Sequence, residues 1–190
     1  ARLLCRWAAT LGRTADAERY GTLADAIGAG FRSRFTDGAG HLTSDTQCAY
    51  ALTIAFDLAG DEERLRVAGE RLAALVEDCG AHVGTGFAGT PVLTGALTRT
   101  GHTAEAYRLL LEDTCPSWLY AVSMGATTTW ERWDSMLPDG SINPGEMTSF
   151  NHYALGAVTQ WLLTELAGLA VSAPGGSALR VAPVVGHGFS

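Results

Sequence analysis

The sequence predicts an all-α fold built from successive pairs of helices, with the start of a β-domain at its C-terminal end. Through most of the chain, apolar residues recur at three- and four-residue steps, as they do along one face of a helix. Three junctions also share a plan in which one helix ends at a glycine and another begins at once. Their glycines, Gly12, Gly60 and Gly101, are 48 and 41 residues apart. This spacing is typical of a repeating antiparallel helix pair, in either an open solenoid or a closed toroid.

The helices are expected in the following order: 14–35, 46–59, 61–80, a short helix after Pro91, 103–113 and about 148–167. Side chains that commonly cap a helix N-terminus stand at four of these starts: Thr14, Thr46 or Asp45, Asp61 and Thr103. Two stretches interrupt the pattern. Residues 80–91 contain four glycines, and residues 114–150 are expected to form a long loop, a kind of segment that often carries function.

The C-terminal segment changes character. Residues 1–170 are expected to form the helical domain, whereas 171–190 are rich in proline and glycine and are expected to be a linker with a first strand at 178–185. Because the chain starts inside a helical pattern and ends in a strand pattern, we expect it to be an excerpt of a longer protein. Its N-terminus carries no leader pattern, so the sequence leaves open whether the protein is cytoplasmic or secreted.

Composition excludes several functional classes. Hydrophobic residues make up 47% of the chain and charged residues 17%, which argues against intrinsic disorder. No apolar run reaches the roughly 18 residues of a membrane span. A net charge of −7 argues against nucleic acid and anionic lipid as partners. The four cysteines form no CxxC pair, so we expect free buried thiols, no metal site and no cofactor.

The densest group of chemically capable residues runs from Thr127 to Asp134, with Glu131 between Trp130 and Arg132 and near Trp133. A carboxylate flanked by two indoles suits a sugar site, since aromatic faces pack on a pyranose and the carboxylate handles a proton. The alternative is that both tryptophans are core residues and that Glu131 and Arg132 form a surface pair. Composition alone leaves these two interpretations open.

Two further clusters accompany it. Ser149 to Tyr153 is expected at a helix N-terminus, where Asn151 and His152 could bind hydroxyls. There the alternative is that Ser149 caps the helix and His152 bonds a backbone carbonyl. The glycine-rich run 84–90 lacks the Lys-Ser/Thr ending of a phosphate loop, so we expect a tight turn lying close to a ligand or another helix.

Taken in order, four runs resemble the catalytic domain of bacterial α-L-rhamnosidases of glycoside hydrolase family 78. They are 85–90 (TGFAGT), 116–118 (PSW), 125–134 (GATTTWERWD) and 149–154 (SFNHYA). The resemblance covers nearly the whole chain, with Thr129 standing where an aliphatic residue is frequent. It implies an (α/α)6 toroid of helix pairs, of which residues 1–170 would be the C-terminal half, followed by the first strand of a truncated β-sandwich.

The resemblance also implies an inverting glycosidase that releases terminal non-reducing α-L-rhamnose from glycosides or polysaccharides. Glu131 then corresponds to the general base, His152 and Asn151 to ligands of sugar hydroxyls, and Trp130 and Trp133 to the pocket wall. The general acid is expected outside these residues, in the first half of the toroid. The fragment alone is therefore expected to be inactive or poorly soluble. The alternatives are another toroid glycosidase, acting on glucosyl, trehalose or unsaturated uronyl substrates, and a non-catalytic helical scaffold.

Overall fold

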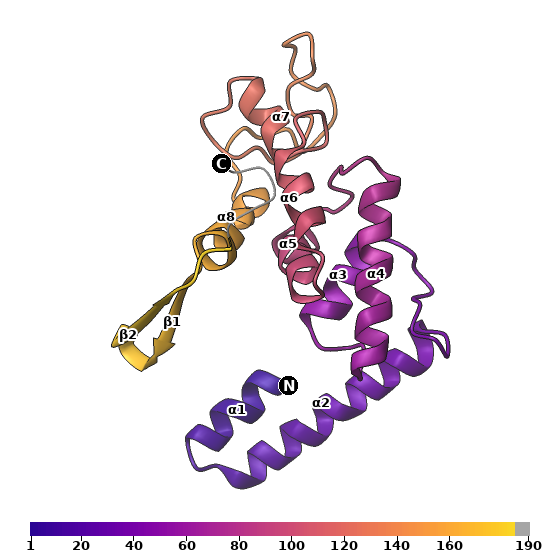
Figure 1. The fold of residues 1–190 in the computed structure, drawn as a ribbon, viewed down its shortest axis with the longest axis vertical. Helices are drawn as coiled ribbons and strands as arrows, with labels where there is room; N and C mark the ends of the chain where they lie inside the picture. The colour runs from indigo at the N-terminus through magenta and orange to yellow at the C-terminus, as the bar shows by residue number, and fades with distance from the viewer. Residues whose placement is uncertain (185–190) are drawn as a thin grey trace.

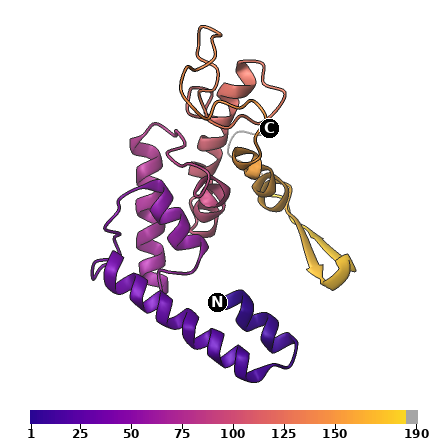
Figure 2. The ribbon, with the colours of Figure 1, turned by 180° about the vertical axis from the view of Figure 1, so that it is seen from behind.

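A computed structural model describes residues 1–184 of the chain. The helices α1 and α2 form a hairpin at one end, α3 to α6 pack in the middle, and α7 lies among loops at the other end (Figure 1). The β-hairpin extends away from the helices (Figure 2). The helices are α1 (Arg2–Thr10), α2 (Thr14–Phe35), α3 (Gln47–Ala55), α4 (Glu62–Asp78), α5 (Thr90–Arg99), α6 (Thr103–Leu111), α7 (Trp118–Ser123) and α8 (Val158–Trp161). Within the described residues, none of these helices is long and apolar enough to cross a membrane.

The predicted pairing of consecutive helices is confirmed. Helix α1 contacts α2, α3 contacts α4, and α5 contacts α6, while α3 and α5 also pack on each other. The three junction glycines have positive φ angles, +69° at Gly12, +98° at Gly60 and +87° at Gly101. Glycine adopts this left-handed conformation without the steric cost that a Cβ would add, so it allows one helix to end and the next to start within a few residues.

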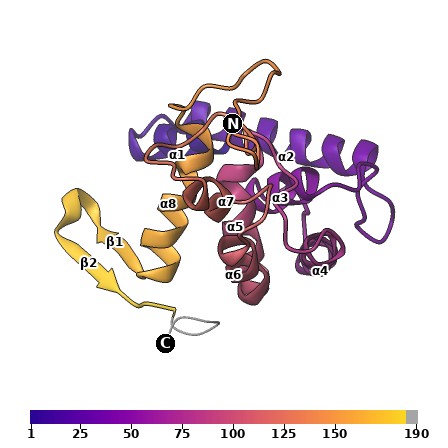
Figure 3. The ribbon, with the colours of Figure 1, turned by 90° about the horizontal axis from the view of Figure 1, so that it is seen from above.

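The core lies between α3, α4, α5 and α6. The buried Trp161 of α8 joins it from the C-terminal segment. Its indole Nε1 donates to Thr98 Oγ1 at 2.9 Å, and its ring meets Tyr107 edge-on with centroids 5.6 Å apart. Helix α8 is thereby fixed against α5 and α6, on the side of the bundle opposite to α4 (Figure 3). The fully buried core side chains include Tyr50, Ile54, Leu72, Val76, Leu93, Leu97, Tyr107 and Leu109.

Two of the four predicted caps are confirmed. Thr46 accepts a hydrogen bond from the N–H of Ala49, and Asp61 accepts one from the N–H of Arg64. The predictions for Thr14 and Thr103 are wrong, because both residues lie inside the first helical turn and neither starting helix has a side-chain cap bond. An N-cap residue with an extended backbone can accept from the N–H three residues further on. Thr46 and Asp61 have this conformation.

Some predicted helix limits are also wrong. Helix α3 ends at Ala55 rather than at residue 59, since Asp57 adopts a left-handed φ of 56°. The helix expected from residue 148 begins only at Ala154, as a 3-10 turn (Ala154–Ala157) that continues into α8 and then into a π-helix (Leu162–Leu166). Helix α7 lies inside the segment that was expected to be loop. It begins where Ser117 accepts a hydrogen bond from the N–H of Tyr120.

The C-terminal part of the described chain is an antiparallel hairpin of β1 (Leu169–Ala173) and β2 (Ala178–Val181), in which Leu169 faces Val181. The strand expected at 178–185 is therefore found as far as Val181, and its last residue lies outside the described part. The sequence predicted a linker where β1 forms. The turn between the strands is a short 3-10 segment (Pro174–Gly176), in which Gly175 and Gly176 both have φ near +70°.

Candidate active site

Two sequence clusters that were singled out separately lie side by side in the structure. The N–H of Glu131 donates to the carbonyl of Ser149 at 2.9 Å, and the N–H of His152 donates to the carbonyl of Thr129 at 2.8 Å. The hydroxyl of Thr128 also donates to the carbonyl of Phe150. Residues 128–131 and 149–152 are thus held side by side as two loop segments. This pairing replaces the helix expected at residue 148, because these N–H groups bond across to a distant segment instead of along a helix.

Glu131 lines a cavity of about 450 Å³. Its side chain is partly buried, and its Oε2 accepts a hydrogen bond from the N–H of Ser149 at 3.1 Å. The same two residues therefore bond each other twice, once through the backbone and once through the carboxylate. The cavity is also lined by the 85–87 turn, by residues 132–134, by Glu146 and Met147, and by Leu155. A carboxylate in this position can act on a molecule that occupies the cavity.

The two tryptophans of the cluster occupy different places. Trp130 is only 4% exposed, meets Phe150 edge-on at 5.3 Å, and lines a second cavity of about 330 Å³. Trp133 is partly buried, meets Trp118 edge-on at 5.4 Å, and lines both cavities. Of the two indoles, Trp133 is the one that shares a cavity with Glu131.

The ring of His152 lies between two aromatic rings. It stacks on Phe87 with centroids 4.7 Å apart and on Tyr153 at 5.0 Å. The N–H of Ala154 donates to Nδ1 at 3.2 Å, so a neutral imidazole carries its proton on Nε2 and can donate from there. The alternative in which His152 bonds a backbone carbonyl does not describe this geometry, since His152 precedes the helix and accepts from an N–H. Binding of hydroxyls by His152 and Asn151 stays a prediction. Asn151 is exposed and does not line the cavity of Glu131.

The glycine-rich run forms the tight turn that the sequence predicted, close to helix α3. A Cβ on Gly89 would lie 2.8 Å from Cys48 Sγ, so only glycine fits there without displacement. The buried side chain of Gln47 accepts from the N–H of Gly84 at 2.8 Å and donates to the carbonyl of His82 at 3.1 Å. The turn that supplies Phe87 to the cavity wall is therefore tied to α3.

A polar network that the sequence did not reveal lies at the wall of the cavity. Arg132 makes a bidentate ion pair with Asp134, at 2.6 and 3.1 Å, and Asp134 also accepts from Asn143 Nδ2 at 2.8 Å. The opposite charges of Arg132 and Asp134, two residues apart, were a usable signal for an ion pair. Asn143 carried no such signal, since it lies in a distant part of the loop.

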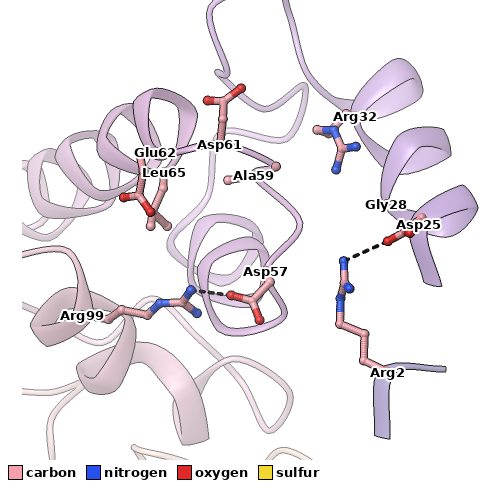
Figure 4. Close-up of a pocket in the computed structure, with 11 residues that line it drawn as sticks. Arg2, Asp25, Gly28, Arg32, Asp57, Ala59, Asp61, Glu62, Leu65 and Arg99 are labelled. Carbon is pink, nitrogen blue, oxygen red and sulfur yellow. Dashed lines mark hydrogen bonds and ion pairs between the residues drawn. The ribbon is translucent and has the colours of Figure 1, made fainter. Parts of the chain in front are cut away.

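A charged cavity of about 370 Å³ lies between the α1–α2 hairpin and the rest of the chain (Figure 4). Its basic side chains face acidic ones: Arg2 lies 3.6 Å from Asp25, and Arg99 pairs with Asp57. These pairs leave the cavity little surplus charge with which to select a charged ligand. None of the residues that line it lines the cavity of Glu131.

Residues 1–184 contain no group of three His, Cys, Asp or Glu side chains placed to hold a metal ion. The four cysteines are free, but Cys79 is exposed and the other three are only partly buried, so the expectation of core thiols is wrong. The charged side chains that line the cavity of Glu131 are Glu131, Arg132, Asp134 and Glu146. The chemistry it can perform rests on the carboxylates and rings already described.

Comparison with known proteins identifies the family. Residues 1–166 match the model of the bacterial alpha-L-rhamnosidase six-hairpin glycosidase domain. An alpha-L-rhamnosidase from Streptomyces avermitilis is 46% identical over 170 residues, which is 90% of this chain and 16% of that protein. One from Alteromonas sp. is 38% identical over 91% of this chain and 19% of that protein. The chain thus spans less than a fifth of these two relatives.

Solved structures agree. The alpha-L-rhamnosidase of Aspergillus terreus superimposes with a TM-score of 0.93 at 39% identity, over 97% of this chain and 21% of that one. The Streptomyces avermitilis alpha-L-rhamnosidase complexed with L-rhamnose gives 0.90 at 43% identity, over 97% of this chain and 18% of that one. The predicted helix-pair glycosidase fold is confirmed by these neighbours and by the family model. The chain belongs to the bacterial α-L-rhamnosidase family, as part of its six-hairpin glycosidase domain.

Proposed function

We propose that the protein containing this chain is an inverting α-L-rhamnosidase, which releases terminal non-reducing α-L-rhamnose from glycosides or polysaccharides. The observation that carries the proposal is the carboxylate of Glu131 at the wall of a cavity, with one oxygen bonded to the N–H of Ser149. The names of the relatives and the L-rhamnose complex of one of them support the substrate class. A non-catalytic scaffold would not need a carboxylate placed in this way.

In this proposal Glu131 is the general base. The Ser149 N–H holds Oε2, and Oε1 accepts a proton from the water that attacks the anomeric carbon. As the new C–O bond forms, the bond to the leaving oxygen breaks on the opposite face of the sugar, and a general acid protonates that oxygen. Inverting enzymes place the two carboxyl groups about 6.5–9.5 Å apart, so that water and sugar fit between them.

We assign no general acid within this chain. Asp134, the neighbouring carboxylate on the cavity, bonds Arg132 through both oxygens and Asn143 through one of them, so its oxygens are already engaged within the chain. Glu146 is exposed at the cavity mouth. The proposal therefore takes the acid from another part of the six-hairpin domain, which makes that part a required partner of the segment described here.

The proposal gives the remaining predicted residues distinct roles. Trp133 packs on an apolar face of the sugar, while Trp130 supports the segment from behind. His152 donates from Nε2 to a sugar hydroxyl, with its ring held between Phe87 and Tyr153. Asn151, on the exposed side of the same segment, contacts a hydroxyl farther from the base.

The test is the full-length protein with Glu131→Gln, assayed on an aryl α-L-rhamnoside. Loss of a general base lowers kcat by about 10²–10⁴-fold. Glu70→Gln on α4 is the matched control, since that exposed carboxylate pairs with Arg66 outside the cavity, and it should keep the wild-type rate. A Glu131→Gln enzyme with undiminished kcat would remove the base assignment.

Two further measurements separate the alternatives. NMR of the first product should show β-L-rhamnose, the inverted anomer, whereas initial α-L-rhamnose would refute inversion. A panel that includes an α-glucoside, trehalose and an unsaturated uronyl disaccharide tests the other six-hairpin activities. Faster turnover of any of these than of the rhamnoside would replace the proposed substrate.

A further inference from the structure

The side chain of Arg132 extends under the loop formed by residues 143–147. Its Nε and Nη2 donate to the two oxygens of Asp134, and its Nη1 donates to the carbonyl of Glu146 at 3.2 Å. A Cβ on Gly145 would lie 2.8 Å from Nη1, so the loop backbone rests directly on the guanidinium. Arg132 thus links the segment that carries Glu131 to a loop that lies more than ten residues away along the chain.

Asn143 ties the start of the same loop. Its Nδ2 donates to Asp134 Oδ2 at 2.8 Å, its Oδ1 accepts from the N–H of Gly145 at 2.9 Å, and its own N–H donates to the carbonyl of Ser135 at 2.9 Å. Arg132 and Asn143 therefore share one carboxylate, Asp134. A planar guanidinium that makes a bidentate pair and one further bond is held more firmly than a single-point contact would hold it.

The loop held in this way forms part of the cavity mouth. Glu146 and Met147 both line the cavity of Glu131, and Met147 is 59% exposed. Met147 also has a φ of 59°, a left-handed conformation that costs a non-glycine residue roughly 1–2 kcal/mol. Such a conformation persists when the surrounding structure imposes it, and here the two residues before Met147 are held by bonds to Asn143 and Arg132.

We infer that Arg132, acting through Asp134 and Asn143, is a positioning residue that fixes Glu146 and Met147 where they contact the leaving group of the substrate. This inference rests on the proposed function. The sugar that is cleaved off enters toward Glu131, so the group attached to it extends past the cavity mouth. Exposed side chains at that mouth select among leaving groups, and they do so only if their loop is held in place.

The experiment compares two rhamnosyl substrates in the full-length protein. The first, α-L-rhamnosyl fluoride, has a leaving group too small to reach the mouth, and the second is a rhamnosyl-glucose disaccharide. Arg132→Met should raise the KM for the disaccharide about tenfold while changing its kcat and the kinetics of the fluoride by less than about threefold. Arg132→Lys should fall between wild type and Arg132→Met, since lysine cannot make the bidentate pair.

The matched control is Arg71→Met. Arg71 makes an equally short bidentate pair with Asp45, at 2.9 and 2.7 Å, and does not line the cavity. It should leave both substrates unaffected. An equal loss on both substrates with Arg132→Met, or the same change with Arg71→Met, would show a general structural role and overturn the inference.

Two loop variants keep the test decisive if Arg132→Met folds poorly. Met147→Ala and Glu146→Gln change exposed side chains, and together they should reproduce the selective rise in KM for the disaccharide. If the loop variants leave that KM unchanged, the loop does not touch the leaving group and the inference fails. If the wild-type protein hydrolyses neither substrate, the proposed function fails first, which is a distinct result.

Discussion

Residues 1–190, produced alone, should self-associate. The chain exposes 10794 Å² of surface, whereas a compact monomer of 20.0 kDa exposes about 8,700 Å². The excess of about 2,000 Å² is well above the roughly 800 Å² that each partner contributes to a standard protein–protein interface. A surface of this size is ordinarily covered in a stable protein.

Much of the exposed apolar surface lies on the α1–α2 hairpin. Exposed apolar patches beyond a few hundred Å² promote association in water, because burying them is favourable by about 25 cal/mol per Å². Since the chain spans less than a fifth of its two named relatives, we expect other parts of the same domain to cover this face. The large apolar side chains exposed on α1 and α2 include Leu3, Leu4, Trp7, Leu23, Ile27 and Phe35.

The assay is size-exclusion chromatography with light scattering, together with binding of a dye that fluoresces on apolar surface. The isolated chain should elute as oligomers or aggregates and bind the dye. Substituting Trp7→Lys with Ile27→Lys should reduce both signals, whereas Val122→Lys, at an exposed apolar residue on α7, should have a smaller effect. A monodisperse monomer that binds no dye and unfolds in one sharp transition would refute the reasoning.

Two substitutions in the full-length protein test how individual hydrogen bonds contribute to the stability of the fold. Gln47→Leu should destabilise the fold by about 2–4 kcal/mol, measured by denaturant unfolding against the exposed control Gln160→Leu, because it leaves the Gly84 N–H and the His82 carbonyl without their partner. Glu112 accepts bonds from the N–H and hydroxyl of Thr114, which hold the pKa of its carboxyl below the usual 4.5. A lowered pKa stabilises the fold above pH 4.5 and loses that effect as the pH falls below it, so Glu112→Gln should lower the melting temperature at pH 7 but little at pH 3.

Local sequence signals predicted the helix pairs well. The range of α2 and the caps at Thr46 and Asp61 depend on neighbouring residues, and so does the left-handed turn at each junction glycine. The helix expected from residue 148 does not form there because of contacts with a distant segment, which no local pattern reveals. The backbone of Ser149 and His152 bonds to residues 129–131, and an amide that bonds there cannot also bond along a helix.

At the candidate site, too, the sequence predicted which residues matter but not the contacts that they make with distant segments. The sequence placed Glu131, Trp133 and His152 among its candidate residues because their types and order are informative. It could not predict that Ser149 would hold the Glu131 carboxylate or that Asn143 would share Asp134 with Arg132. Those contacts join segments separated by about ten to twenty residues of irregular chain, whose path is set by tertiary packing.

The two tryptophans lie in different places because their aromatic partners differ. Trp130 packs edge-on against Phe150, from the segment that bonds to residues 129–131, and is buried there. Trp133 packs edge-on against Trp118, at the start of α7, and lines the cavity of Glu131. Both partners lie more than ten residues away along the chain, so tertiary packing, and no local spacing, determines that Trp133 is the indole placed to meet a sugar.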